Sequence, residues 1–200
     1  MKNILLLIIF LLGISQFGIA QRDSKGSFEV SVLGSDFVNR TSFGLSLGVN
    51  KNWHEYFQVG FGVQFAFHSQ SNTFGYEMGS PNFSATAFTF NNTAHLYSIG
   101  NFSVDANANL GLLILNLSDR DTGYYNPAFD TFEAETLAWE TFRFLQGGIT
   151  LNYIVSRRTD TNVSIFARVL KNQALGNVRF GGESANSNLQ FNIGVKINLF

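Results

Sequence analysis

The sequence predicts an all-β fold, an eight-stranded antiparallel up-and-down transmembrane β-barrel. Eight segments alternate between apolar residues and small or uncharged polar residues, which is the period of a strand with one apolar face. The segments are longer than the average strand of about 5 to 6 residues, and roughly 9 to 11 residues are enough for a tilted strand to cross a bilayer. Charged residues make up only 14% of the 200-residue chain, against about 25% in soluble domains.

Residues 1–20 are predicted to be a secretory signal peptide that is cleaved after Ala20. A lysine precedes an apolar run from Ile4 to Leu12, and small residues follow near the cleavage point. The run is much shorter than the about 20 residues of a spanning helix, which disfavours an uncleaved anchor. We therefore expect a barrel domain over residues 21–200. The chain has no cysteine, which excludes a disulfide framework and thiolate metal sites.

The first half of the domain contains four predicted strands, at residues 27–35, 41–50, 56–69 and 83–97. Apolar side chains occupy every second position, and the fourth strand is the least regular. The four apolar faces are formed by Phe28, Val30 and Val32; by Phe43, Leu45, Leu47 and Val49; by Phe57, Val59, Phe61, Val63, Phe65 and Phe67; and by Phe88, Phe90, Ala94 and Leu96. The alternation predicts half-buried strands, but by itself it does not say which face meets water.

Four more strands are predicted at residues 102–114, 139–153, 162–170 and 189–200. The sixth changes phase, because Phe142 and Phe144 have one parity whereas Ile149, Leu151 and Tyr153 have the other. An extra residue near Gly147 and Gly148 would restore the facing, so we expect a β-bulge there. The other apolar faces are formed by Phe102, Val104, Ala106, Ala108, Leu110, Leu112 and Ile114; by Val163, Ile165, Ala167 and Val169; and by Leu189, Phe191, Ile193, Val195, Ile197 and Leu199.

The chemistry of the polar face favours a membrane barrel over a soluble, lipocalin-like one. A soluble barrel would carry Lys, Glu and Asp on that face, whereas here it consists of Gly, Ser, Asn, Gln and Thr. Small polar residues suit a crowded barrel interior, and the large aromatic residues of the other face suit lipid. Few charged residues fall within the predicted strands: Glu29, Asp105, Glu140, Arg143, Arg168 and Lys196.

Connections of unequal length point to the same architecture. Three of the four connections on one side, "QSNTFGYEMGSPN", "LSDRDTGYYNPAFDTFEAETL" and "KNQALGNVRFGGESANSN", exceed every turn on the other side, "KNWHE", "SIGN" and "VSRRTDT". Long outer loops and short periplasmic turns are typical of transmembrane barrels, as are aromatic girdles at both interfaces. We expect Trp53, Tyr56, Tyr97, Phe102 and Tyr153 in the periplasmic girdle, and Phe43, Phe67, Phe83 and Trp139 in the outer one.

Over residues 27–200 the chain resembles the small eight-stranded outer membrane β-barrel proteins of the OmpA/OmpX type. The most specific shared feature is a final strand, "FNIGVKINLF", that ends on the aromatic residue Phe200. The resemblance implies location in the outer membrane of a Gram-negative cell, contact with outer membrane lipid, and an assembly signal at Phe200 for the outer membrane assembly machinery. Phe200 departs from the family pattern, because it is out of phase with Leu199 and Ile197. The fold hosts many functions and implies no biochemical role.

The inward face suggests a filled lumen. Eight strands leave an interior just wide enough for side chains, which disfavours a general diffusion pore. We expect a polar network that satisfies its own hydrogen bonds, with a narrow polar conduit as the alternative. The proposed members are Glu29, Gln58, Gln64, Asp105, Asn107, Asn109, Arg168 and Lys196.

The sequence offers only weak candidates for a catalytic site or a metal site. His68, followed by Ser69, invites comparison with lipid-modifying barrel enzymes, but it has lumen parity and no positioned acidic partner, so we expect no enzyme activity. Asp119, Asp121 and Asp130 form an imperfect calcium-loop pattern and a weak candidate for a divalent ion; we expect neither a bound metal nor a cofactor.

The function expected from the sequence is that of an outer membrane barrel with a structural, adhesive or loop-mediated interaction role. The alternative is a narrow transport or permeability channel. Loss of Lys2 with the signal would leave a small net negative charge, so nucleic acid is not an expected partner. We expect a monomer, and the sequence does not identify an extracellular partner.

Overall fold

The computed structural model describes residues 25–37, 40–69, 79–128, 131–176 and 187–200. The predicted signal peptide lies outside these residues. The described chain forms eight strands, whose bounds are β1 Gly26–Phe37, β2 Arg40–His54, β3 Phe57–Ser69, β4 Pro81–Ile99, β5 Phe102–Asn126, β6 Thr131–Arg157, β7 Thr161–Leu175 and β8 Ser187–Leu199. Among the described residues there is no helix that is long and apolar enough to cross a membrane.

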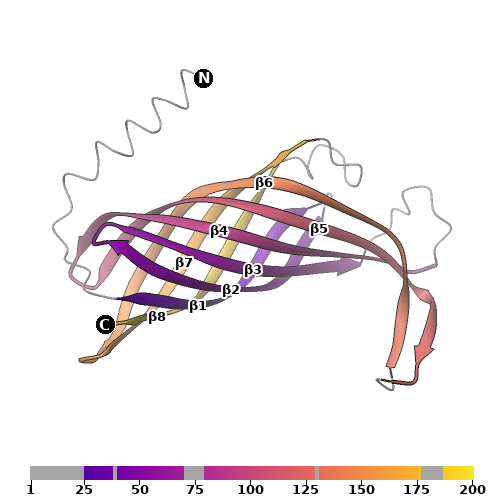
Figure 1. The fold of residues 1–200 in the computed structure, drawn as a ribbon, viewed down its shortest axis with the longest axis horizontal. Coiled ribbons are helices and arrows are strands. Elements are labelled where there is room, and N and C mark those ends of the chain that lie inside the picture. Colours follow the sequence, from indigo (N-terminus) through magenta and orange to yellow (C-terminus); the bar gives the residue numbers. More distant parts are fainter. Residues whose placement is uncertain (1–24, 38–39, 70–78, 129–130, 177–186) are drawn as a thin grey trace.

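Each strand pairs antiparallel with the next, and β1 pairs with β8, so the sheet closes into a barrel (Figure 1). This confirms the predicted fold class. The connections β2–β3, β4–β5 and β6–β7 are short turns that lie at one end of the barrel with the carboxyl terminus. The β4–β5 turn uses Gly100 at φ 60°, a left-handed conformation that glycine adopts without steric cost.

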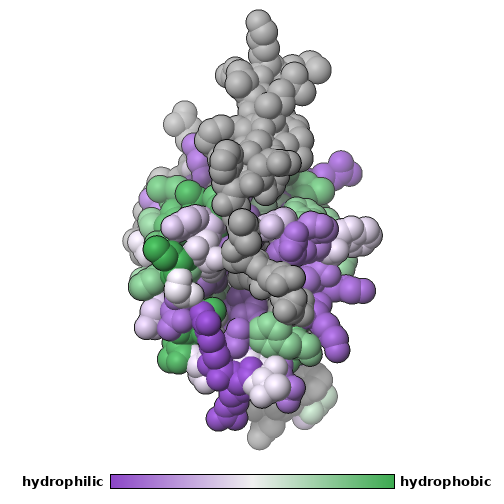
Figure 2. Space-filling model, turned by 90° about the vertical axis from the view of Figure 1, so that its left-hand side faces the viewer, coloured by the Kyte–Doolittle hydropathy of each residue, from purple (hydrophilic) through white to green (hydrophobic). Residues whose placement is uncertain are grey.

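Figure 2 shows the barrel from the end with the short turns, where hydrophilic and hydrophobic side chains are mixed. Lys51, Arg157, Arg158 and Asp160 are exposed at this end. The wall of the barrel between the two ends is different. Its outward positions carry large apolar side chains on every strand, including Val32, Leu45, Phe61, Phe88, Leu110, Leu151, Ile165 and Ile193, each of which is at least 48% exposed.

The predicted bulge near Gly147 and Gly148 is wrong. The register of β6 runs through both glycines without a shift, against β5 on one side and β7 on the other. The phase change has another cause: Phe142 and Phe144 point into the barrel and are 8% and 3% exposed, whereas Ile149 is outside. Apolar residues therefore occupy inward positions in one half of the interior.

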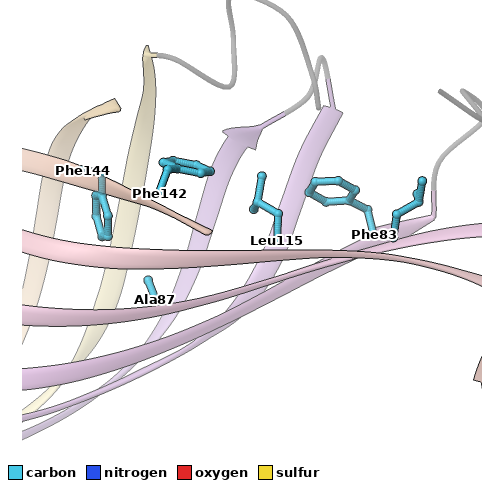
Figure 3. Packing of buried hydrophobic residues seen from close by; sticks show 6 residues of the cluster. Phe83, Ala87, Leu115, Phe142 and Phe144 are labelled. Carbon is cyan, nitrogen blue, oxygen red and sulfur yellow. The ribbon is translucent and has the colours of Figure 1, made fainter. Parts of the chain in front are cut away.

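The inward apolar residues form a cluster on β4, β5 and β6 (Figure 3). Its buried members are Phe83, Ala87, Leu115, Leu117, Phe142 and Phe144. Phe83, which we expected in the outer lipid-facing girdle, is 1% exposed and lies inside the barrel, so that expectation is wrong. A Cβ at Gly111 would lie 2.4 Å from the Phe144 ring, so the glycine leaves the space that this ring occupies.

The third outer connection is mostly strand, although the sequence predicted a long loop there. β5 continues to Asn126 and β6 begins at Thr131, and both run past the other strands and bend away from the barrel (Figure 1). The register shifts between Leu117 and Ser118 and again between Asp119 and Gly123. We call the paired extension, residues 119–126 and 131–135, the arm.

Candidate functional site

The half of the interior nearest the short turns is held by a buried ionic cluster. Glu29 on β1 lies opposite Lys196 on β8, and their charged atoms, Oε1 and Nζ, are 3.0 Å apart. The other carboxylate oxygen of Glu29 accepts a hydrogen bond of 2.6 Å from Arg168 on β7. Lys196 also donates to Gln58 Oε1 at 2.9 Å, and the Asn50 amide donates to Glu29 at 3.2 Å. One carboxylate thus holds two cations within a ring of amides.

The cluster continues across the lumen through hydroxyl and amide groups. Arg168 Nε donates to Thr150 Oγ1 at 2.8 Å, and the guanidinium lies 4.9 Å from the centre of the Phe166 ring. Thr150 also accepts a hydrogen bond of 2.7 Å from Asn107, whose own oxygen accepts one from Thr93. Arg168 is therefore fixed by groups on several strands.

A second pair of ionisable side chains lies on β4 and β5. His95 Nδ1 is 2.8 Å from Asp105 Oδ1, and the other oxygen of Asp105 accepts a hydrogen bond of 2.9 Å from Asn152. Both members of the pair are almost fully buried. We did not include His95 in the expected network, although its parity with Thr93 placed it on the polar face. Its link to Asp105 depends on the β4–β5 register, which shifts between His95 and Tyr97.

A layer of amide side chains crosses the barrel, on the side of the ionic cluster that is farther from the short turns. Asn109 donates to Gln146 Oε1 at 3.2 Å, and the Gln146 amide donates to Gln190 at 3.3 Å and to Gln64 at 3.5 Å. Gln190 in turn donates to Asn192. All eight residues expected in a lumen network therefore contact at least one other polar side chain on the inside of the barrel, together with residues that the sequence did not single out.

The described interior is joined by ion pairs and by hydrogen bonds between polar side chains. Buried charges are tolerated when they are paired and hydrogen-bonded, and fully connected amide networks are rigid. In the part of the chain that the structure describes, no three His, Asp or Glu side chains are grouped to hold a metal ion. The side chain of His68, the residue behind the enzyme alternative, lies outside the described residues.

The aromatic residues expected in the girdles lie at the ends of the wall. Near the short turns, Trp53, Tyr97 and Phe102 are between 52% and 78% exposed, and the ring centroids of Phe102 and Tyr153 are 4.7 Å apart with the ring planes tilted by 51°. Tyr56, in the β2–β3 turn, is half-buried. At the other end, the exposed fractions of Phe43, Phe67 and Trp139 are 61%, 60% and 71%.

The aspartates of the weak metal candidate lie at the base of the arm, except for Asp130, which lies outside the described residues. The carboxylate of Asp119 already has hydrogen-bond donors within the chain: it accepts hydrogen bonds of 2.9 to 3.1 Å from the backbone amides of Gly79, Ser80 and Asp121. These bonds, the one from Ser80 above all, lower the pKa of Asp119 below its usual 3.8. The carboxylate joins the start of β4 to the bulge in β5.

No protein-family model matches the sequence, and no curated protein matches it either. Among solved structures, the chain is similar to Neisserial surface protein A, with a TM-score of 0.54 and 8% identity over 87% of this chain and 94% of that one. The chain has the fold of a small outer membrane β-barrel. Looser similarities are to Ail of Yersinia pestis (TM-score 0.46, 10% identity, 88% and 97% covered) and to the amino-terminal barrel domain of Pseudomonas aeruginosa OprF (0.44, 11%, 88% and 100%).

Proposed function

We propose that the protein is an integral outer membrane barrel that acts through contacts made outside the cell by its arm. The membrane part of this proposal is supported by the wall of exposed apolar side chains, since soluble monomers rarely expose apolar patches larger than about 300 to 600 Å². The proposal includes Phe200 as part of an assembly signal; its backbone amide donates a hydrogen bond to the backbone carbonyl of Asp160.

The arm is the observation that supports a contact role. Its two strands pair with each other up to Asn126 and Thr131, but β4 pairs with β5 only as far as Asp119, and β7 pairs with β6 only from Arg143. Within the described residues, β6 therefore has no second neighbour from Thr131 to Phe142. An exposed strand edge presents backbone donors and acceptors that can pair with an extended segment of another chain.

The lumen argues against the alternative of a channel. The ionic cluster and the amide layer join side chains from opposite walls, which supports a filled interior rather than a general diffusion pore. We therefore expect no steady conductance from the protein in a planar bilayer. Discrete openings that change on substitution of Asp105 or Arg168 would instead support the channel.

Adhesion of whole cells tests the contact role. In the test variant, residues 120–134 are replaced by Asn-Gly, a turn that closes a two-residue hairpin after the Asp119–Glu135 pair. The matched control replaces residues 158–160, a turn at the opposite end, in the same way. Loss of cell–cell aggregation or of binding to serum-coated surfaces in the first variant alone supports the proposal. Equal binding by both variants and the parent, with equal surface levels, contradicts it.

A further inference from the structure

The half of the barrel away from the short turns contains a cavity that the network does not fill. Its atom-free space measures about 550 Å³, including its open mouth. Phe142, Phe144, Leu113 and Leu33 form much of its wall, and Gln146 and Gln190 belong to its floor. Since the amide layer and the ionic cluster block the barrel beneath this floor, access is from the end that carries the arm.

The cavity exists because small side chains replace large ones along one row of the inner wall. Gly44 on β2 pairs with Ala66 on β3, which pairs with Ala85 on β4. The same row continues to Leu33 on one side and to Leu115 on the other. An unfilled apolar cavity forfeits dispersion contacts and costs stability. An eight-stranded barrel is wide enough to hold one small ligand when its side chains leave room.

The chemistry of the lining restricts the ligand. None of the described side chains that line the cavity carries a charge, so an ion bound among them would lose its hydration without a counter-charge. The wall is apolar, and the floor offers amides. Asn172 donates to Asn188 at 2.7 Å and to Gln190 at 3.3 Å, but its buried Oδ1 has no hydrogen-bond partner within the described residues. That oxygen can accept a hydrogen bond from a hydroxyl group.

From this lining we infer that the barrel binds a small, neutral amphiphile, a hydrocarbon with a terminal hydroxyl group, in the cavity between the amide layer and the outer end. The hydrocarbon lies against Phe142, Phe144 and the alanine row, and the hydroxyl group points to the amide floor. This inference rests on the interior alone and does not depend on what the arm contacts.

Methyl NMR of the full mature chain in lipid nanodiscs tests the inference, with 1-octanol as the probe. We expect saturable shifts of the Ala66, Ala85 and Ala87 methyl signals. The outward-facing Ala108 and Ala167 report alcohol that has dissolved in the lipid, and their shifts should rise without saturation. Octanesulfonate and octylammonium, which are charged, should leave the inner methyl groups unshifted, and n-octane should bind about three- to tenfold more weakly, because it lacks one neutral hydrogen bond.

A matched pair of variants separates the cavity from the lipid surface. Ala66→Leu fills the cavity and should abolish the saturable shifts, whereas Ala108→Leu adds the same atoms to the outer face and should leave them unchanged. If Ala66→Leu does not fold, Ala85→Leu replaces it. The inference is overturned if the inner methyl groups follow Ala108 without saturation, if the charged probes bind as well as 1-octanol, or if the filled variant still binds.

Discussion

Replacing Glu29 with glutamine should destabilise the barrel strongly, because it removes the carboxylate that pairs with the buried Lys196 and the partly buried Arg168. Glu29 lies 2.6 Å from Arg168 and 3.0 Å from Lys196, and Lys196 is 2% exposed. At an effective dielectric constant of about 20, each attraction is about 6 kcal/mol before the cost of desolvation is subtracted. Removing one member of a buried ion pair costs about 3 to 5 kcal/mol in proteins, and we expect a loss in that range for Glu29→Gln.

Reversible unfolding in urea, in the presence of lipid vesicles at neutral pH, measures this loss. The matched control is Asp160→Asn, which neutralises an exposed carboxylate in the β6–β7 turn and should change the free energy of unfolding by no more than about 0.5 kcal/mol. Combining Glu29→Gln with Lys196→Met should recover part of the loss, because one uncompensated cation is removed. A loss below about 1 kcal/mol for Glu29→Gln, or no recovery in the double variant, would show that the pairing of Glu29 with these cations does not stabilise the barrel.

Two further predictions concern the interior wall and the arm. Gly111→Ala should lower the free energy of unfolding by about 1 to 3 kcal/mol in the same assay, because its Cβ would collide with the Phe144 ring. The control is Gly147→Ala, whose Cβ meets nothing within 4 Å and which should therefore cost less. Equal costs for the two variants would contradict this packing. The lowered pKa of Asp119 means that its contribution is complete above its unfolded value of 3.8 and is lost as the pH falls through the lower folded value. Hydrogen exchange at the Gly79 and Ser80 amides should therefore accelerate, beyond the intrinsic pH effect, as the pH falls below about 4. Asp119→Asn should abolish that dependence, and an unchanged profile in this variant would contradict the assignment.

The facing of β1, β2 and β8 can be predicted from the sequence, because apolar and polar residues alternate almost regularly in these strands. In β1, β2 and β8 one parity is mostly apolar and the other is mostly Gly, Ser, Asn or Gln, so the facing of each strand is clear; Leu33 is an exception, an apolar residue that faces inward. Glu29 and Lys196 can be placed in the lumen by parity alone. Their partners cannot, because the Glu29–Arg168 contact joins strands that are not adjacent and depends on the closed shape of the barrel.

The other half of the interior could not be predicted from the alternation. In β5 the run "LGLLILNL" is apolar at both parities, so Leu113 and Leu115 gave no signal that they face inward. For Phe142 and Phe144 the expected bulge implies the lipid face, because the expected lumen is polar throughout. The period-two rule identifies two faces, but it cannot tell a lipid face from an apolar inner wall when both are apolar.

The strand structure of the arm could not be predicted from its sequence, for a different reason. The arm contains Asp119, Asp121, Gly123 and Asn126, residue types that are depleted in strands. The pairing of Gly123 with Ala134 and of Asn126 with Thr131 is an extension of a ladder that already exists in the barrel wall. A ladder that is nucleated elsewhere can continue through residues of low strand propensity, and that context is not visible in a short window of sequence.

We propose that the outward apolar wall of the barrel lies in lipid. A single cysteine that replaces Leu47 tests this placement. Leu47 is in the middle of β2, faces outward and is 43% exposed, and the absence of native cysteine means that a bimane label reports this position alone. After folding into vesicles, the label on Leu47→Cys should be quenched by lipids that are brominated in their acyl chains and should be insensitive to iodide in the water. Quenching by iodide without quenching by the brominated lipids would place this face in water and contradict the account.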